Sequence, residues 1–425
     1  MIWLLIGYMF LYIHRPFELW PVLASVRLEL VYMLVTGTLW AVLARKHWLS
    51  HSLHLAYLAF LGVVLICWLA SPWMGQAVDK VDRFVKSFAM YLLIVTLIHD
   101  AATLRRVVLA MLGITAVYML HSLWEFHHGR FVFRMGIPRL IGVDSTLSDP
   151  NSFGAGVVYS LPFLLPFARR DASWMLKLFL VGYVLLALVC IGLTGSRSSL
   201  VGLAVFVLLL IWYSAYRWRL LVLTLVIAPV FFLLLPSALQ KRFETIIDPS
   251  AGPANAQASA RSRLEGLLIG LELFSRYPLT GCGPGVWRKA SGSPLEPHNL
   301  YGQVLGELGL PGALALGLLV GLYAVHVRRL RRLYADVPQR RHHFLHQMTL
   351  ALWMVLILLL FMGNFSHNLF RHTWIWSGAL LVVTSHCARQ QLAAAGVAGW
   401  RPTANRRSWP PYPLASRLNR AVLPA

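Results

Sequence analysis

The sequence predicts an all-α polytopic membrane protein with about twelve transmembrane helices and one large outward loop that contains short helices. Its composition is the first indication, because 58% of the 425 residues are hydrophobic and only 13% are charged. The second is that apolar runs of roughly 20 residues recur along the chain, long enough to cross a bilayer as helices. Both features are typical of polytopic membrane proteins and exclude an ordinary soluble domain.

The predicted spans follow these apolar runs from one end of the chain to the other. They lie near residues 1–13, 23–43, 53–70, 84–98, 106–123, 152–167, 175–194, 199–216, 220–239, 299–327, 348–365 and 372–387. The organisation expected from them is a first group of spans (1–239), an outward loop (240–298), a second group of spans (299–387) and a tail (388–425). The tail is rich in Arg, Pro and Ala, and we expect it to be disordered.

Basic residues predict the orientation of the chain. Clusters such as Arg45-Lys46, Arg105-Arg106 and Arg169-Arg170 fall on alternate loops, and further arginines lie in the tail. By the positive-inside rule this side is cytoplasmic. Most of the net charge of +22 is therefore explained by topology. No basic and aromatic module accompanies it, so no nucleic-acid partner is expected.

The outward-facing arginines need a separate reason. Arg197 lies in the short turn 194–199, where two helix ends would hold its guanidinium at the membrane boundary. The following serines begin a helix, whose N-terminus favours an anion, and arginine can bind two phosphate oxygens at once. Arg261, Arg263 and Arg371 are further outward candidates. The alternative is that such arginines contact lipid phosphates or pair with carboxylates.

One amphipathic helix is expected within the outward loop. Ser259 or Ser262 could cap it, and Leu264, Leu267, Leu268 and Leu271 follow helical spacing up to about Tyr277. The glycines of 281–285 would end it. Such a helix would lie at the outer interface with Arg261 and Arg263 near its N-terminus, or would serve only as a packing lid.

Two histidines stand at outer helix ends. His298 and Asn299 precede the tenth predicted span, and a helix N-terminus disfavours imidazolium. A neutral histidine there can act as a general base; the alternative is a helix cap. His367 lies in a similar His-Asn-Leu-aromatic motif and is a rival base. Glu307, inside the tenth span, is expected to have a structural partner.

No metal site and no cofactor are predicted. The patterns CxxC, HExxH and Asp-x-Asp are absent, and the four cysteines give no disulfide framework. If the substrate carries a diphosphate, arginines would have to stabilise its charge.

Four ordered motifs resemble those of the O-antigen ligase/polymerase superfamily. They are Ser196-Arg197-Ser198, Ser262-Arg263-Leu264-Glu265, the segment 277–285, and the run from His298 through Gly312. The resemblance implies a GT-C-like membrane glycosyltransferase of the bacterial inner membrane with a periplasmic active site. Its substrates would be O-antigen linked to undecaprenyl diphosphate and the lipid A–core oligosaccharide, within membrane lipids.

The resemblance also implies roles for individual residues. His298 would be the catalytic base, and Arg197 and Arg263 would bind the donor diphosphate. Arg261, two residues before Arg263, could take the place of Arg263 in this role. Arg371 would assist them, and Asn299 and His367 would position substrate.

Other functions remain open at this point. An O-antigen polymerase or a protein O-oligosaccharyltransferase would use the same donor. An exporter of lipid-linked glycan is the alternative from another class, although the chain shows no clear internal repeat.

Overall fold

The structure is a computed structural model that describes residues 1–134, 136–169, 171–246, 255–334 and 343–394. The first half of the chain forms α1 (Ile2–His14), α2 (Pro16–Leu19), α3 (Pro21–Ser25), α4 (Leu28–Leu43), α5 (Leu53–Leu69), α6 (Met74–Leu97), α7 (Ala101–His127), β1 (Val132–Arg134), β2 (Ile137–Arg139), α8 (Pro150–Ser160), the 3₁₀ helix η1 (Leu161–Phe167), α9 (Trp174–Thr194) and α10 (Arg197–Tyr213). The second half forms α11 (Arg217–Leu234), α12 (Ser237–Glu244), α13 (Asn255–Arg276), α14 (Trp287–Ser291), α15 (Leu300–Leu333), α16 (Phe344–Gly363) and α17 (His372–Ala394).

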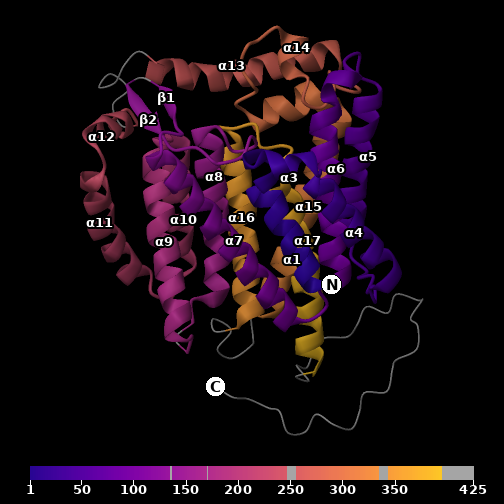
Figure 1. Cartoon of the computed structure of the whole chain (residues 1–425), viewed down its shortest axis with the longest axis vertical. Coiled ribbons are helices and arrows are strands. Elements are labelled where there is room, and N and C mark those ends of the chain that lie inside the picture. The colour runs from indigo at the N-terminus through magenta and orange to yellow at the C-terminus, as the bar shows by residue number, and fades with distance from the viewer. Residues whose placement is uncertain (135, 170, 247–254, 335–342, 395–425) are drawn as a thin grey trace.

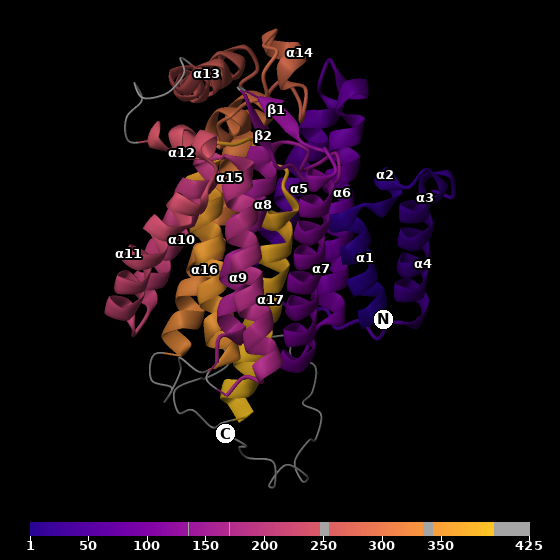
Figure 2. The same cartoon turned by 60° about the vertical axis from the view of Figure 1, so that its left-hand side comes forward.

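The long helices run side by side as a bundle, and α13 and α14 lie across one end of it (Figures 1 and 2). Within the described residues the only sheet is the antiparallel pair β1–β2. Five described helices are long and apolar enough to cross a membrane, namely α7, α9, α11, α15 and α16, and three shorter apolar helices are α4, α5 and α10. The all-helical membrane fold is therefore confirmed in its main features. The count of twelve spans, the domain limits and the GT-C class stay predictions.

Some predicted boundaries are wrong for local reasons. The outward helix begins at Asn255 rather than at Ser259 or Ser262, because the Ala- and Gln-containing residues 255–258 contain no helix breaker. The sixth predicted span changes from α-helix to the 3₁₀ helix η1 after Ser160, because Pro162 and Pro166 lack the amide hydrogen that an α-helix needs. In the last span, α17 continues to Ala394; the predicted tail beyond it lies outside the described residues.

Glycines bring α13 into direct backbone contact with the outer end of α15. A Cβ atom on Gly270 would lie 2.4 Å from the carbonyl oxygen of Gly302, and a Cβ on Gly302 would lie 2.4 Å from that of Gly266. Gly306 faces Gly270 one turn further along. The sequence Gly302-x-x-x-Gly306 thus permits the close approach of α13. The outward helix is thereby fixed over the bundle.

The helix α15 is interrupted at Gly309. That residue has φ 63° and ψ −158°, a conformation almost restricted to glycine. The carbonyls of Gly306 and Glu307 instead accept the amides of Cys282 and Gly283 at 2.8 and 3.1 Å. The carboxylate of Glu307 also accepts the amide of Gly285 at 3.0 Å, which confirms its predicted structural partner. The loop after α13 is therefore bonded to the outer segment of α15.

Candidate active site

His298 and His367 lie close together at the end of the bundle covered by α13. His298 precedes α15, and Gly266 of α13 approaches its backbone so closely that an added Cβ would be 3.3 Å from the His298 amide nitrogen. His367 lies in the loop between α16 and α17. The two ring centroids are 5.8 Å apart. The two candidate bases thus belong to one site, and both side chains are half-buried.

The surroundings of His367 keep its imidazole neutral. Burial, together with the charges of Lys80, His298, Arg371 and Arg288, holds the pKa of His367 well below its usual value of 6.5. Its Nδ1 atom is buried without a hydrogen-bond partner in the described structure. A neutral ring of this kind can accept a proton or orient a hydroxyl group.

Arg197 and Arg263 form a second part of the site. Arg197 is the first residue of α10, and its Nη1 donates to Thr245 Oγ1 at 3.1 Å. The guanidinium of Arg263 lies 4.8 Å from the ring centroid of Phe365, two residues before His367. Burial and the charge of Arg197 lower the pKa of Arg263. The structure therefore brings together both arginines, and a bound anion would relieve their repulsion.

Arg371 is anchored to α8. Its Nη2 donates to the Ser152 carbonyl at 2.8 Å, and its guanidinium lies 5.7 Å from the Tyr159 ring centroid. Burial lowers the pKa of Arg371, whereas Asp149 and Asp144 act in the opposite direction. Part of its charge is thus balanced within the protein, and its role with a donor diphosphate stays a prediction.

Asn299 and Arg261 are the remaining predicted site residues, and the described part of the structure shows no free side-chain group of either that faces the two histidines. Asn299 is only 7% exposed, and its Oδ1 accepts the amides of Tyr301 and Gly302 at 2.9 and 3.0 Å. The side chain therefore caps α15, and substrate positioning by Asn299 stays a prediction. Arg261 lies on α13, but its side chain falls outside the described residues.

Two cations near the histidines are absent from the sequence prediction. Lys80 of α6 acts electrostatically on His367 and on Glu307, and its Nζ lies 5.8 Å from the ring centroid of Phe370. Arg288 of α14 also acts on His367. The prediction placed the fourth span at 84–98, which left Lys80 in a loop of mixed charge. A survey of every outward cation beside a span would have included it.

The described part of the chain contains no group of three or more His, Cys, Asp or Glu residues that could hold a metal ion. Cationic side chains also lie in this region: Lys80 and Arg371 act electrostatically on His367, and Arg197 acts on Arg263.

Comparison with known proteins adds one finding. Residues 182–317 match a family model described as O-antigen ligase. The match runs from α9 into α15 and includes Arg197, Arg263 and His298, whereas Lys80, His367 and Arg371 lie outside it. No curated protein matches the chain.

Proposed function

We propose that this chain, whose residues 182–317 match a family model described as O-antigen ligase, transfers O-antigen polysaccharide from undecaprenyl diphosphate to a sugar hydroxyl of lipid A–core oligosaccharide. The reaction would take place on the periplasmic side of the bacterial inner membrane, at the end of the bundle covered by α13. At a coarser level, the family match supports a membrane glycosyltransferase-like enzyme.

The observation that carries this proposal is the pair of histidines within a cluster of cations. A ring-to-ring separation of 5.8 Å leaves both imidazoles within reach of one bound hydroxyl group. Lys80 and Arg371 act electrostatically on His367, and Arg197 acts on Arg263, whose guanidinium lies against Phe365. A proton acceptor beside several fixed positive charges suits a reaction in which a hydroxyl attacks and a diphosphate leaves.

The proposed reaction is a single displacement with inversion. His298 takes the proton of the acceptor hydroxyl while its oxygen forms a bond to the anomeric carbon of the donor sugar. The bond between that carbon and the diphosphate oxygen breaks, and its electron pair leaves with the diphosphate. His367, neutral and half-buried, orients the acceptor hydroxyl or replaces His298 as the base.

Fixed cations would carry the charge of the departing diphosphate without a metal ion. Arg197 acts electrostatically on Arg263 in the absence of substrate, and fixed charges of this kind need little reorganisation when negative charge develops. Burial lowers the dielectric constant around them and strengthens their effect.

An O-antigen polymerase or a protein O-oligosaccharyltransferase would use the same donor and the same base, and would differ only in the acceptor. An exporter of lipid-linked glycan would need the cations but no proton acceptor. The experiment must therefore establish whether glycan is transferred and which molecule receives it.

The test is transfer by the purified full-length protein in EDTA, with lipid-linked O-antigen as donor and rough lipopolysaccharide as acceptor. His298→Ala should reduce the rate by about 10²- to 10⁴-fold, as expected for loss of a general base. His128→Ala, an exposed histidine at the end of α7, is the matched control and should transfer normally.

His367→Ala decides between the two histidines. A loss in His367→Ala with near-normal rates in His298→Ala would reverse their roles. Extension of lipid-linked glycan by further repeat units, with rough lipopolysaccharide unmodified, would identify a polymerase instead. Absence of any transfer by folded wild-type protein would contradict the enzymatic proposal.

A further inference from the structure

The loop that carries His367 contacts two cations from different parts of the chain. Phe365 in this loop lies with its ring centroid 4.8 Å from the guanidinium of Arg263. Phe370, three residues after His367, has its ring centroid 5.8 Å from Lys80 Nζ. The loop therefore connects an arginine of α13 with a lysine of α6, and the histidine stands between the two aromatic contacts along the chain.

The helices that carry the cations lie on two sides of the bundle. In Figures 1 and 2, α10 and the start of α13 lie on one side, and α6 and α14 lie on the other. Arg197 and Arg263 come from the first side, and Lys80 and Arg288 from the second. In the proposed displacement with inversion, the attacking hydroxyl and the departing diphosphate lie on opposite sides of the anomeric carbon. If Arg197 and Arg263 bind the diphosphate, the cations of α6 and α14 face the acceptor.

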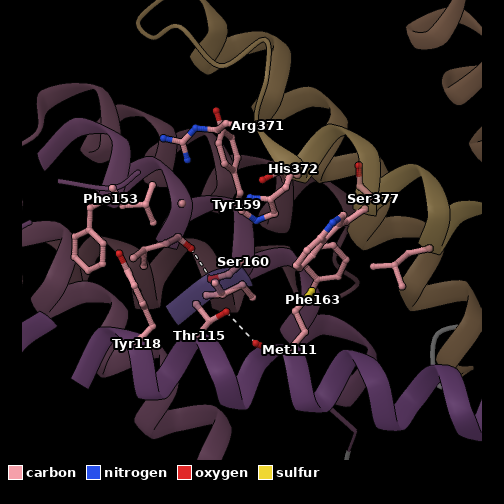
Figure 3. A pocket seen from close by; sticks show the side chains of 17 residues that line it. Met111, Thr115, Tyr118, Phe153, Tyr159, Ser160, Phe163, Arg371, His372 and Ser377 are labelled. Atoms are coloured by element: carbon pink, nitrogen blue, oxygen red, sulfur yellow. Dashed lines mark hydrogen bonds between the residues drawn. The ribbon is translucent and has the colours of Figure 1, made fainter. Parts of the chain in front are cut away.

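Arg371 also acts on His367, but it is held by another helix. It lines a cavity between α8 and α17 together with Tyr159 and Ser160 (Figure 3). Its Nη2 donates to the Ser152 carbonyl at 2.8 Å. Arg371 is therefore bonded to α8, which leaves two of the cations that act on His367 on the side of α6 and α14.

The short helix α14 holds Arg288 in a fixed place. Trp287 is 1% exposed and belongs to a small buried cluster with Ala77 of α6 and Leu273 of α13. A Cβ atom on Gly306 of α15 would lie 2.8 Å from the Trp287 ring. The backbone of α14 is thus packed against three helices, whereas the side chain of Arg288 is 60% exposed and can reach a ligand.

Arg288 has one carboxylate partner, and that partner is replaceable. Its Nε lies 3.1 Å from Glu296 Oε1, and the Glu296 side chain is 37% exposed. An exposed ion pair of this kind changes an equilibrium by about fivefold at most. A guanidinium has five N–H donors, so Arg288 can also bind a second anion while Glu296 stays in place. Glu296 precedes His298 by two residues, which keeps the pair close to the proposed base.

Lys80 supplies a second positive charge from the opposite wall. A Cβ atom on Gly285 would lie 2.9 Å from Lys80 Cβ, so the loop before α14 packs on the stem of this lysine. Within the described residues Lys80 forms no salt bridge. A half-buried ammonium beside an exposed guanidinium favours an anionic group, and charge-assisted hydrogen bonds to phosphate or carboxylate are the strongest that these side chains form.

We propose that Arg288 and Lys80 bind an anionic substituent of the acceptor glycan, a phosphate or a carboxylate, and so place the acceptor hydroxyl at the histidine pair. This subsite rests on the proposed transfer function and deepens it, because it makes Arg288 a specificity-determining residue for the acceptor. Glu296 competes with the ligand for Arg288.

The experiment measures initial transfer rates of the full-length protein with donor saturating and rough lipopolysaccharide varied, at about pH 8, where a histidine of ordinary pKa is neutral. Arg288→Gln should raise the acceptor KM about 3- to 10-fold and leave kcat within about twofold, because a charged partner is lost while both histidines remain. Glu296→Gln should lower the acceptor KM about 2- to 5-fold, because Arg288 is then released from its internal competitor.

Arg276 and Glu272 form the matched control pair. They are an ion pair on α13 whose side chains are both 56% exposed, and neither is among the groups that act on His367. Arg276→Gln and Glu272→Gln should leave the acceptor KM unchanged. A purely structural pair of Arg288 and Glu296 would give changes in the same direction when either residue is replaced, and that result would overturn the proposal.

Two treated acceptors identify the anion. Removal of phosphates with phosphatase, or reduction of carboxylates to alcohols, should raise the wild-type KM as much as Arg288→Gln does, and Arg288→Gln should then have no further effect. Either group supports the proposal, whereas no rise with either treatment would overturn it, as would a rise in the donor KM alone in Arg288→Gln. Transfer with an unchanged acceptor KM in Arg288→Gln would overturn the subsite alone. Absence of any transfer by folded wild-type protein would overturn the proposed function and the subsite with it.

Discussion

Replacing Gly270 by alanine tests whether the contact between α13 and α15 places the catalytic groups. The new Cβ would lie 2.4 Å from the carbonyl oxygen of Gly302, whereas ordinary contact begins at 3.4 Å. The obstacle is backbone, so no side-chain rotation relieves it, and α13 must move away by about 1 Å. Overpacking of this kind costs about 1–3 kcal/mol.

Such a shift would move Arg263, on the same helix, relative to His298. A misplacement of about 1 Å at a catalytic site can reduce a rate by about 10²-fold, so we expect Gly270→Ala to lose transfer activity by about that factor. The assay is the initial rate of in-vitro transfer by purified protein, together with its thermal unfolding midpoint.

Gly317→Ala is the matched control on α15, because a Cβ at Gly317 meets nothing within 4 Å. It reports the gain from alanine in a helix, about 1 kcal/mol, without the clash. A Gly270→Ala protein that transfers within about twofold of Gly317→Ala and unfolds at the same temperature would refute the reasoning.

Three further outcomes are expected. Arg263→Lys should lower the transfer rate roughly 10- to 100-fold because an ammonium cannot bind two phosphate oxygens in a fork, whereas Arg276→Lys, 56% exposed on the same helix, should not; equal rates would contradict a role for Arg263. Lys80→Gln removes a charge that lowers the pKa of His367, so that pKa rises and the acid limb of the pH–rate profile should move to higher pH; an unmoved limb would show that His367 does not titrate in the reaction. Gly309→Ala should lower the free energy of unfolding by about 1–3 kcal/mol in a denaturant titration, since φ 63° with ψ −158° strains any residue with a Cβ; unchanged stability would argue against the helix break.

The sequence was sufficient to locate the candidate residues that stand at outer helix ends. Arg197 and His298 are polar groups at the boundaries of apolar runs, so topology alone singles them out. It could not show that His298 and His367 face each other, because that contact depends on how α15 and α16 pack. The pattern Gly302-x-x-x-Gly306 is typical of a close helix contact, but it does not identify α13 as the partner.

Lys80 was absent from the sequence prediction because the predicted span began too late in α6. α6 begins at Met74, and its first turns carry Asp79, Lys80, Asp82 and Arg83 before the apolar segment starts. A search for apolar residues alone therefore starts the helix about three turns late and assigns its charged end to a loop.

The break at Gly309 divides α15 into two segments with different attachments. Residues 300–308 are bonded to the 278–285 loop and packed against α13, and Leu300 and Leu308 also belong to the hydrophobic core of the bundle. The outer segment of α15 therefore joins α13 to the bundle. Gly266 of α13 contacts the backbone of His298, so we expect any displacement of α13 to change the distance between His298 and His367. That distance would then report the position of α13.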